Sequence, residues 1–180
     1  MKKEKKNKYK YFLILALISL FYFLFKKDIA KGINSISMNN NDHIDTLHPK
    51  IRDKVRGFLS KCEALGIPFD ITSSHRTWDE QSALYAQGRT SGGKIVTNAI
   101  AGSSYHNYGL AFDFIPKVNG KRVYDLSAMD RIGRLAEKEG FNWGDEFNDK
   151  PHIEYKGFGN ISKLSALYKS GKTIDKYVIV

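Results

Sequence analysis

The segment SSYHNYGLAFDF, residues 103–114, constrains the fold more than any other part of the chain. Apolar residues occupy every second position from Leu110 to Phe114, which is the pattern of a β-strand with one buried face. Asp113 lies inside this pattern, between two phenylalanines. Because an ionised carboxylate is costly to bury unless it is paired, Asp113 predicts a positively charged partner close to the strand.

The elements before this strand are marked by local signals. Apolar residues recur at helical spacing from residue 51 to residue 65, and Gly66 ends that helix. IPFDITSS then has the composition of a buried strand. Thr77 and Glu80 have the spacing of a capping box, so a second helix is expected to begin at Thr77 and to end at Gly88.

The elements after the strand complete a mixed fold. Asn119-Gly120 predicts a hairpin that returns through residues 122–124, and Ser127 is expected to cap a helix that runs to residue 139. PHIEY reads as a short strand, residues 164–168 suggest a last helix, and YVIV is expected to add an edge strand. This order predicts an α+β fold with a small central antiparallel sheet flanked by helices.

The N-terminus has a different composition. The chain carries a net charge of +10, and nine lysines against two acidic residues in positions 1–31 account for +7 of it. An uncharged run from Tyr11 to Phe25 lies between these lysines. We expect residues 1–27 to be a cytoplasmic basic tail and a single transmembrane helix, residues 28–45 a flexible linker, and residues 46–180 the folded domain, facing outward from the cell membrane. A cleaved signal peptide is the alternative, although no A-x-A-like site follows the run.

The rest of the composition narrows the function. Outside the N-terminal segment the charge is close to balanced, which argues against nucleic-acid binding. Cys62 is the only cysteine, so the exported chain has no internal disulfide and no thiolate metal site. It falls on the apolar face of a helix and is expected to be an inert core residue.

Histidine and carboxylate side chains suggest a metal site. His106 precedes the strand that carries Asp113, and His152 opens a later strand, so all three can converge on one cavity. Nitrogen and oxygen ligands without thiolate suit catalytic Zn²⁺, which takes three protein ligands and leaves one position open. Asp149, three residues before His152, could accept a proton from a metal-bound water. The alternative is structural: a capping His106, an Asp113 paired with Arg76, and a core His152.

The motif Ser104-x-His106-x-x-Gly109-x-Ala111-x-Asp113 resembles the LAS zinc metallopeptidases. The flanking segments SSHRTWDEQSALYAQGRT, GKIVTNA, GFNWG and DKPHIEY resemble one branch of that group, the L-alanyl-D-glutamate endopeptidases of bacterial and phage cell-wall lysis. The likeness covers roughly residues 47–170 and lies in several separated motifs in the same order.

This resemblance implies roles for individual residues. It implies zinc held by His106, Asp113 and His152, with Asp149 as general base and then acid. It also implies that Arg76 stabilises the oxyanion or grips a substrate carboxylate.

The same family pattern leaves three assignments open. Ser104 is either a substrate-binding residue or a turn residue. Trp143 is either a substrate-binding residue or a core residue. The loop between Trp143-Gly144 and Asp149 is shorter than the family pattern, so Glu146 and Glu154 are alternative bases.

The function expected from these residues is zinc-dependent hydrolysis of an amide bond in the peptidoglycan stem peptide, most specifically the L-Ala-D-Glu bond. One alternative is a D,D-carboxypeptidase or dipeptidase acting on D-Ala-D-Ala. Another is a membrane-tethered cell-wall binding module without turnover, since a fold does not fix a function. A monomer that contacts the membrane, the stem peptide and no nucleic acid is expected in each case.

Overall fold

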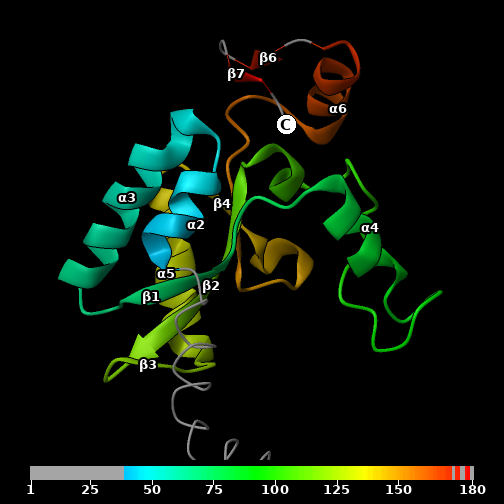
Figure 1. Ribbon diagram of the computed structural model, residues 1–180. Coiled ribbons are helices and arrows are strands. Elements are labelled where there is room, and N and C mark those ends of the chain that lie inside the picture. Colours follow the sequence, from blue (N-terminus) through cyan, green and yellow to red (C-terminus); the bar gives the residue numbers. More distant parts are fainter. Residues whose placement is uncertain (1–38, 172, 175–176, 179–180) are drawn as a thin grey trace, which may run out of the picture. The chain divides into compact units, whose positions relative to one another are not determined.

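The computed structural model describes residues 39–171, 173–174 and 177–178 (Figure 1). The expected N-terminal anchor and the linker up to residue 38 lie outside the described residues. Within the described part, no helix is both long enough and apolar enough to cross a bilayer.

An antiparallel sheet forms the centre of the domain. Its strands are β1 (Phe69–Ser73), β2 (Ala111–Val118), β5 (His152–Glu154) and β4 (Asn142–Trp143), in that order across the sheet. β3 (Lys121–Arg122) returns from β2 through the Asn119-Gly120 turn, as the sequence predicts. The α+β class is therefore confirmed.

The register of β2 against β5 separates the two faces of the sheet. Phe112 lies opposite Ile153, and Asp113 lies opposite His152. Since neighbouring residues of a strand point to opposite faces, the aromatic side chains share one face while Asp113 and His152 share the other.

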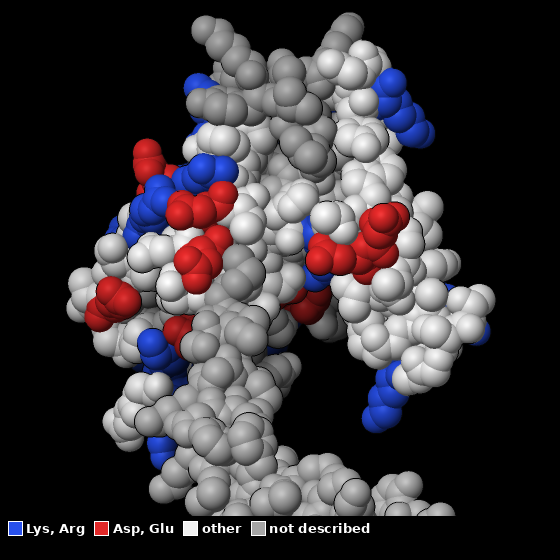
Figure 2. Space-filling model, viewed as in Figure 1, with Lys and Arg blue, Asp and Glu red and all other residues white. Residues whose placement is uncertain are grey.

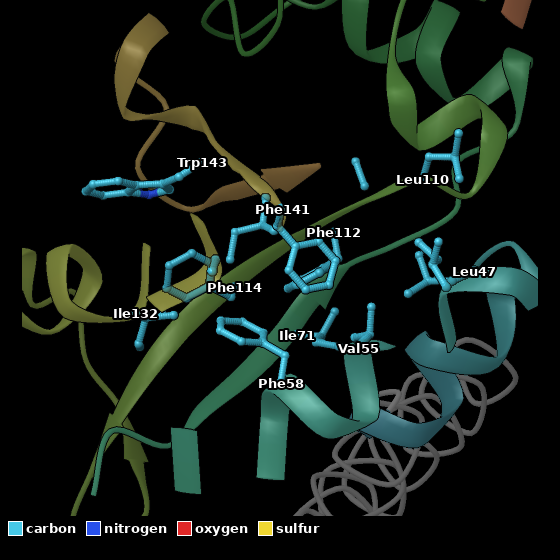
Figure 3. Close-up of a cluster of buried hydrophobic side chains, with 14 of the residues drawn as sticks. Leu47, Val55, Phe58, Ile71, Leu110, Phe112, Phe114, Ile132, Phe141 and Trp143 are labelled. Carbon is cyan, nitrogen blue, oxygen red and sulfur yellow. The ribbon is translucent and has the colours of Figure 1, made fainter. Parts of the chain in front are cut away.

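Helices cover the aromatic face. The ring of Phe58, in α3 (Pro49–Ala64), lies 5.6 Å from Phe69 and 6.5 Å from Phe112, and Figure 3 shows it pointing at the sheet. α5 (Leu126–Lys138) adds Ile132, which is fully buried. Burying each such side chain contributes about 1.5–3 kcal/mol, so this layer is the main core of the domain. Cys62 is fully buried in it, and burial raises the pKa of its thiol to about 12, as expected of an inert core residue.

Helices α4 (Trp78–Ala86) and α6 (Ile161–Lys169) do not belong to the layer formed by α3 and α5. α4 begins at the Thr77 capping box, and Figure 1 shows it on the other side of the strands from α3. α6 precedes a separate two-stranded ladder of β6 (Thr173–Ile174) and β7 (Tyr177–Val178), so Tyr177–Val178 pair outside the central sheet.

Two predicted boundaries were wrong. Residues 40–45 were expected to belong to the linker, but α2 (Asn40–Thr46) is a helix with a capping box on Asn39, and Ile44 is fully buried. The polar composition of this segment hid the single apolar residue that anchors it. The N-cap of α5 is Asp125 instead of Ser127, because the Asp125 side chain accepts the backbone N–H of Ala128.

Charges on the surface of α2 and α3 are mixed. Figure 2 shows acidic and basic side chains next to one another over these helices. Arg56 of α3, for example, pairs with Asp45 at 2.6 Å and with Asp53 at 3.1 Å. Such exposed pairs contribute little stability individually.

Candidate metal centre

Two strands and one short turn bring the predicted ligands together. Asp113 and His152 come from paired positions on β2 and β5. His106 comes from η1 (Tyr105–Tyr108), a 3-10 turn capped by the Ser104 hydroxyl. Gly109 ends this turn at a φ of +63°, and a Cβ there would lie 2.7 Å from the His48 backbone nitrogen. Only glycine fits this close approach without strain, which explains the glycine of the motif.

Asn107 holds the turn in place. Its side chain is fully buried, accepts the Gly102 N–H and donates to the carbonyl oxygens of Arg76 and Thr77. The Arg76 N–H also donates to the His106 carbonyl oxygen at 3.1 Å. The ligand turn is therefore bonded to the start of α4.

The three predicted ligand atoms form a nearly equilateral triangle. His106 Nε2 lies 3.2 Å from Asp113 Oδ1 and 3.2 Å from His152 Nδ1, and His152 Nδ1 lies 3.1 Å from Asp113 Oδ1. Tetrahedral zinc with ligands at about 2.0–2.1 Å would separate neighbouring ligand atoms by about 3.3 Å. The triangle therefore matches one face of a zinc coordination tetrahedron.

Hydrogen bonds on the far side of each imidazole fix which nitrogen faces the centre. His106 Nδ1 lies 2.6 Å from the Ser74 carbonyl oxygen, so it carries the proton and Nε2 presents a lone pair. His152 Nε2 lies 3.1 Å from Glu154 Oε2, so in the neutral ring it donates there and Nδ1 presents a lone pair. Two lone pairs and a carboxylate oxygen repel one another unless a cation lies between them. The donor set fits Zn²⁺, as the sequence predicts.

The ionisation of these groups shows how the charge of Asp113 is balanced. Burial alone would raise the pKa of Asp113, but the nearby His106 and His152 hold it well below its usual range. Burial alone would lower the pKa of His152, but its hydrogen bonds to Asp113 and Glu154 raise it to about 9. Without a metal, a proton on His152 therefore balances the Asp113 carboxylate, and a metal ion must displace that proton to bind.

Arg76 lies beside the ligands, as predicted. One Nη atom donates to Gln81 Oε1 at 2.9 Å, and the other lies 3.0 Å from Ser73 Oγ and 3.5 Å from Asp113 Oδ2. Arg76 therefore meets both expectations. Its guanidinium pairs with Asp113, and it also lines the cavity, where a substrate can contact it.

The three candidate bases lie in different surroundings. Asp149 is solvent-accessible and lines the cavity with the ligands, where desolvation of its carboxyl and the Asp113 charge raise its pKa. Glu154 is buried and bonded to His152 and Lys156, which makes it an orienting partner of the ligand. Glu146 is exposed and is not among the residues that line the cavity.

Trp143 lies in the core and does not line the cavity, so its position agrees with the predicted core role and not with the substrate-binding role. It is 6% exposed, and its indole N–H donates to the Lys150 carbonyl oxygen at 2.8 Å. Gly133 of α5 lies against its ring. The strand register explains this position, because Trp143 pairs with Ile153 and so points to the aromatic face. Ser104 caps η1 and also lines the cavity, so both of its predicted roles are compatible with its position.

A cavity of about 740 Å³ opens over the ligands. Its walls include residues to which the sequence assigned no individual role. Phe147 is the most prominent, since its ring lies 5.7 Å from that of His152 and is half exposed. Further wall residues are Leu84, Val96, Thr97, Asn98, Ala99 and Ile161.

Comparisons with known proteins agree with this site. The VanY family, described as D-alanyl-D-alanine carboxypeptidase, matches residues 44–157. The peptidoglycan L-alanyl-D-glutamate endopeptidase CwlK of Bacillus subtilis is 38% identical over 121 residues, which cover 60% of this chain and 72% of CwlK.

Two solved structures are similar to this chain. A mutant of the vancomycin-resistance D,D-pentapeptidase VanY in complex with Zn(II) matches with a TM-score of 0.50 at 19% identity, over 73% of this chain and 83% of that one. The L-Ala D-Glu endopeptidase ChiX of Serratia marcescens matches with a TM-score of 0.48 at 20% identity, over 67% and 88%. With its ligand triad inside the matched segment, the chain belongs to the VanY family of D-alanyl-D-alanine carboxypeptidases and is a zinc-dependent peptidoglycan peptidase.

Proposed function

We propose that this protein hydrolyses the L-Ala-D-Glu bond of the peptidoglycan stem peptide. The main structural support is the triangle of His106, Asp113 and His152 at the base of a cavity that also contains Asp149. CwlK, which is 38% identical to this chain over 121 residues, is an L-alanyl-D-glutamate endopeptidase, and this supports the choice of bond.

Asp149 is the proposed proton carrier. Zinc, when held by the three ligands, would lower the pKa of a bound water toward about 7 and polarise the scissile carbonyl. A carboxylate in the same cavity can take the proton of the attacking water and then pass it to the leaving amine of D-Glu. The raised pKa of Asp149 suits the first step, because it makes the carboxylate a better proton acceptor.

Arg76 is the proposed electrostatic partner of the substrate. Its hydrogen bonds to Gln81 and Ser73 fix the guanidinium plane, so little side-chain entropy is lost when a substrate oxygen approaches. A permanent positive charge at the cavity wall can stabilise the oxyanion or hold a carboxylate of the stem peptide.

The cellular arrangement is also a proposal. We place residues 1–27 as a tail and single-pass anchor, residues 28–38 as the linker, and residues 39–180 as an outward-facing monomeric domain. The lysines on both sides of the apolar run and its distance from the domain support this order. An outward orientation would bring the cavity to the cell wall.

Digestion of purified peptidoglycan by the full chain in detergent tests the choice of bond. Mass spectrometry is expected to find new C-terminal L-Ala and new N-terminal D-Glu. The family description favours release of D-Ala as a second candidate. Release of D-Ala without new D-Glu termini would contradict the endopeptidase assignment and support that carboxypeptidase activity. Binding to peptidoglycan without any new termini would leave only a binding module.

A further inference from the structure

Helix α2 reaches the metal centre through a closed ring of hydrogen bonds. Thr46 Oγ1 donates to the His43 carbonyl oxygen at 2.7 Å and lies 2.7 Å from Ser74 Oγ. Ser74 Oγ in turn lies 3.0 Å from His43 Nδ1. Since the Thr46 hydroxyl has only one proton, Ser74 must donate to Thr46, and His43 must donate to Ser74.

The ring is buried. Ser74 is 4% exposed and His43 is 8% exposed. A buried hydroxyl or imidazole that loses its partner costs about 1–3 kcal/mol, so the ring strongly favours one arrangement of its members. Hydrogen bonds with His43 and Thr46 of α2 therefore fix the direction of the Ser74 side chain.

The peptide unit between Ser74 and His75 connects this ring to zinc. Its carbonyl oxygen accepts the proton of His106 Nδ1 at 2.6 Å, and its N–H lies 3.4 Å from Thr46 Oγ1. The C=O and N–H of a trans peptide point in opposite directions. The peptide is therefore held between Thr46 on one side and the ligand imidazole on the other.

We infer that α2 is a positioning element for the zinc ligand His106, acting through Thr46, Ser74 and the 74–75 peptide. The helix sets the orientation of the carbonyl that orients the imidazole and selects its tautomer. Groups that directly orient a metal ligand change metal affinity by about 10–100-fold when removed, and Thr46 is one contact further away. Removal of its hydroxyl is expected to weaken zinc binding by about tenfold.

Thr46→Val and Thr46→Ser form the test. Valine keeps the shape of threonine and removes the hydroxyl, whereas serine keeps the hydroxyl. Zinc dissociation constants are measured on the full chain in detergent by competition with a chromogenic chelator, and Co²⁺ absorption reports the ligand geometry. Thr46→Val should bind zinc about tenfold more weakly, and Thr46→Ser should bind as the parent does. Asp45→Asn is the matched control, because Asp45 of the same helix pairs with Arg56 instead of with the ring, and it should leave the affinity unchanged.

Ser74→Ala gives an independent measurement if Thr46→Val does not fold, because it breaks the ring and keeps the carbonyl. It should also weaken zinc binding. Parental affinity and Co²⁺ spectra in both variants, even with a lower unfolding temperature, would show that the ring is only structural and would overturn the inference. A parent chain that binds no zinc would contradict the metal site itself, which is a different failure.

Discussion

The imidazoles of His106 and His152 meet with ring nitrogens 3.2 Å apart, although 46 residues separate them in the chain. Each ring is oriented by a different partner, the Ser74 carbonyl for His106 and the Glu154 carboxylate for His152. Both lone pairs therefore point to one position, beside the Asp113 carboxylate.

His152→Ala should abolish tight zinc binding, because two protein ligands would remain where a catalytic zinc site uses three. Zinc affinity should fall by more than the roughly 100-fold that follows the loss of a group that only orients a ligand. Chelator competition measures the affinity, and activity is assayed before chelation, after chelation and after zinc is restored. His75→Ala, a histidine outside the ligand group, is the control. Activity that survives complete removal of zinc would contradict a metal-dependent reaction.

Asp149→Asn should lower kcat by about 10²–10⁴-fold and leave zinc affinity close to that of the parent, since the residue moves protons and is not a ligand. Steady-state kinetics on a stem-peptide substrate measure the change. Glu146→Gln, three residues away and outside the cavity, should be nearly silent. The opposite pattern, with loss in Glu146→Gln and activity in Asp149→Asn, would exchange the two roles.

Trp143→Phe should reduce stability and leave KM unchanged, because the indole packs in the core and not in the cavity. The variant loses the hydrogen bond to the Lys150 carbonyl and part of the ring, which together cost about 1–3 kcal/mol. Urea unfolding gives the stability, and substrate titration gives KM. A several-fold rise in KM at unchanged stability would restore Trp143 as a substrate-binding residue.

Asp70→Asn should destabilise the domain at neutral pH and have little effect in acid. Burial alone would raise the pKa of Asp70, but its hydrogen bonds with Arg122 and Lys117 hold the pKa below its usual value. The contribution is therefore complete above the pKa of the unfolded chain, about 4, and is lost as the pH falls through the folded value. Because the group is partly exposed, the difference at pH 7 should be only about 1 kcal/mol.

Urea unfolding of the metal-free parent and of Asp70→Asn at pH 7 and pH 3 measures this difference. Chelation in both samples removes the pH dependence of zinc binding from the comparison. A difference that is equal at both pH values would show that the Asp70 charge does not stabilise the fold.

Local sequence signals determined most of the elements and the ligand set. The Thr77 capping box, the Asn119-Gly120 turn and the alternation around Asp113 act over a few residues, so their outcome is visible without tertiary structure. The motif from Ser104 to Asp113 and the later His152 likewise identified the three ligands, because ligand chemistry restricts the residue types at each position.

Only the tertiary structure decided which neighbours support those ligands. α2 is short and polar, and its stability depends on the burial of Ile44 against the sheet and on its contact with Ser74. The register of β4 against β5 directs the Trp143 side chain into the core. Packing of α2 against the sheet brings Thr46 and Ser74 together, although they are distant in sequence. Contacts of this kind depend on long-range geometry that periodicity and spacing along one chain do not encode.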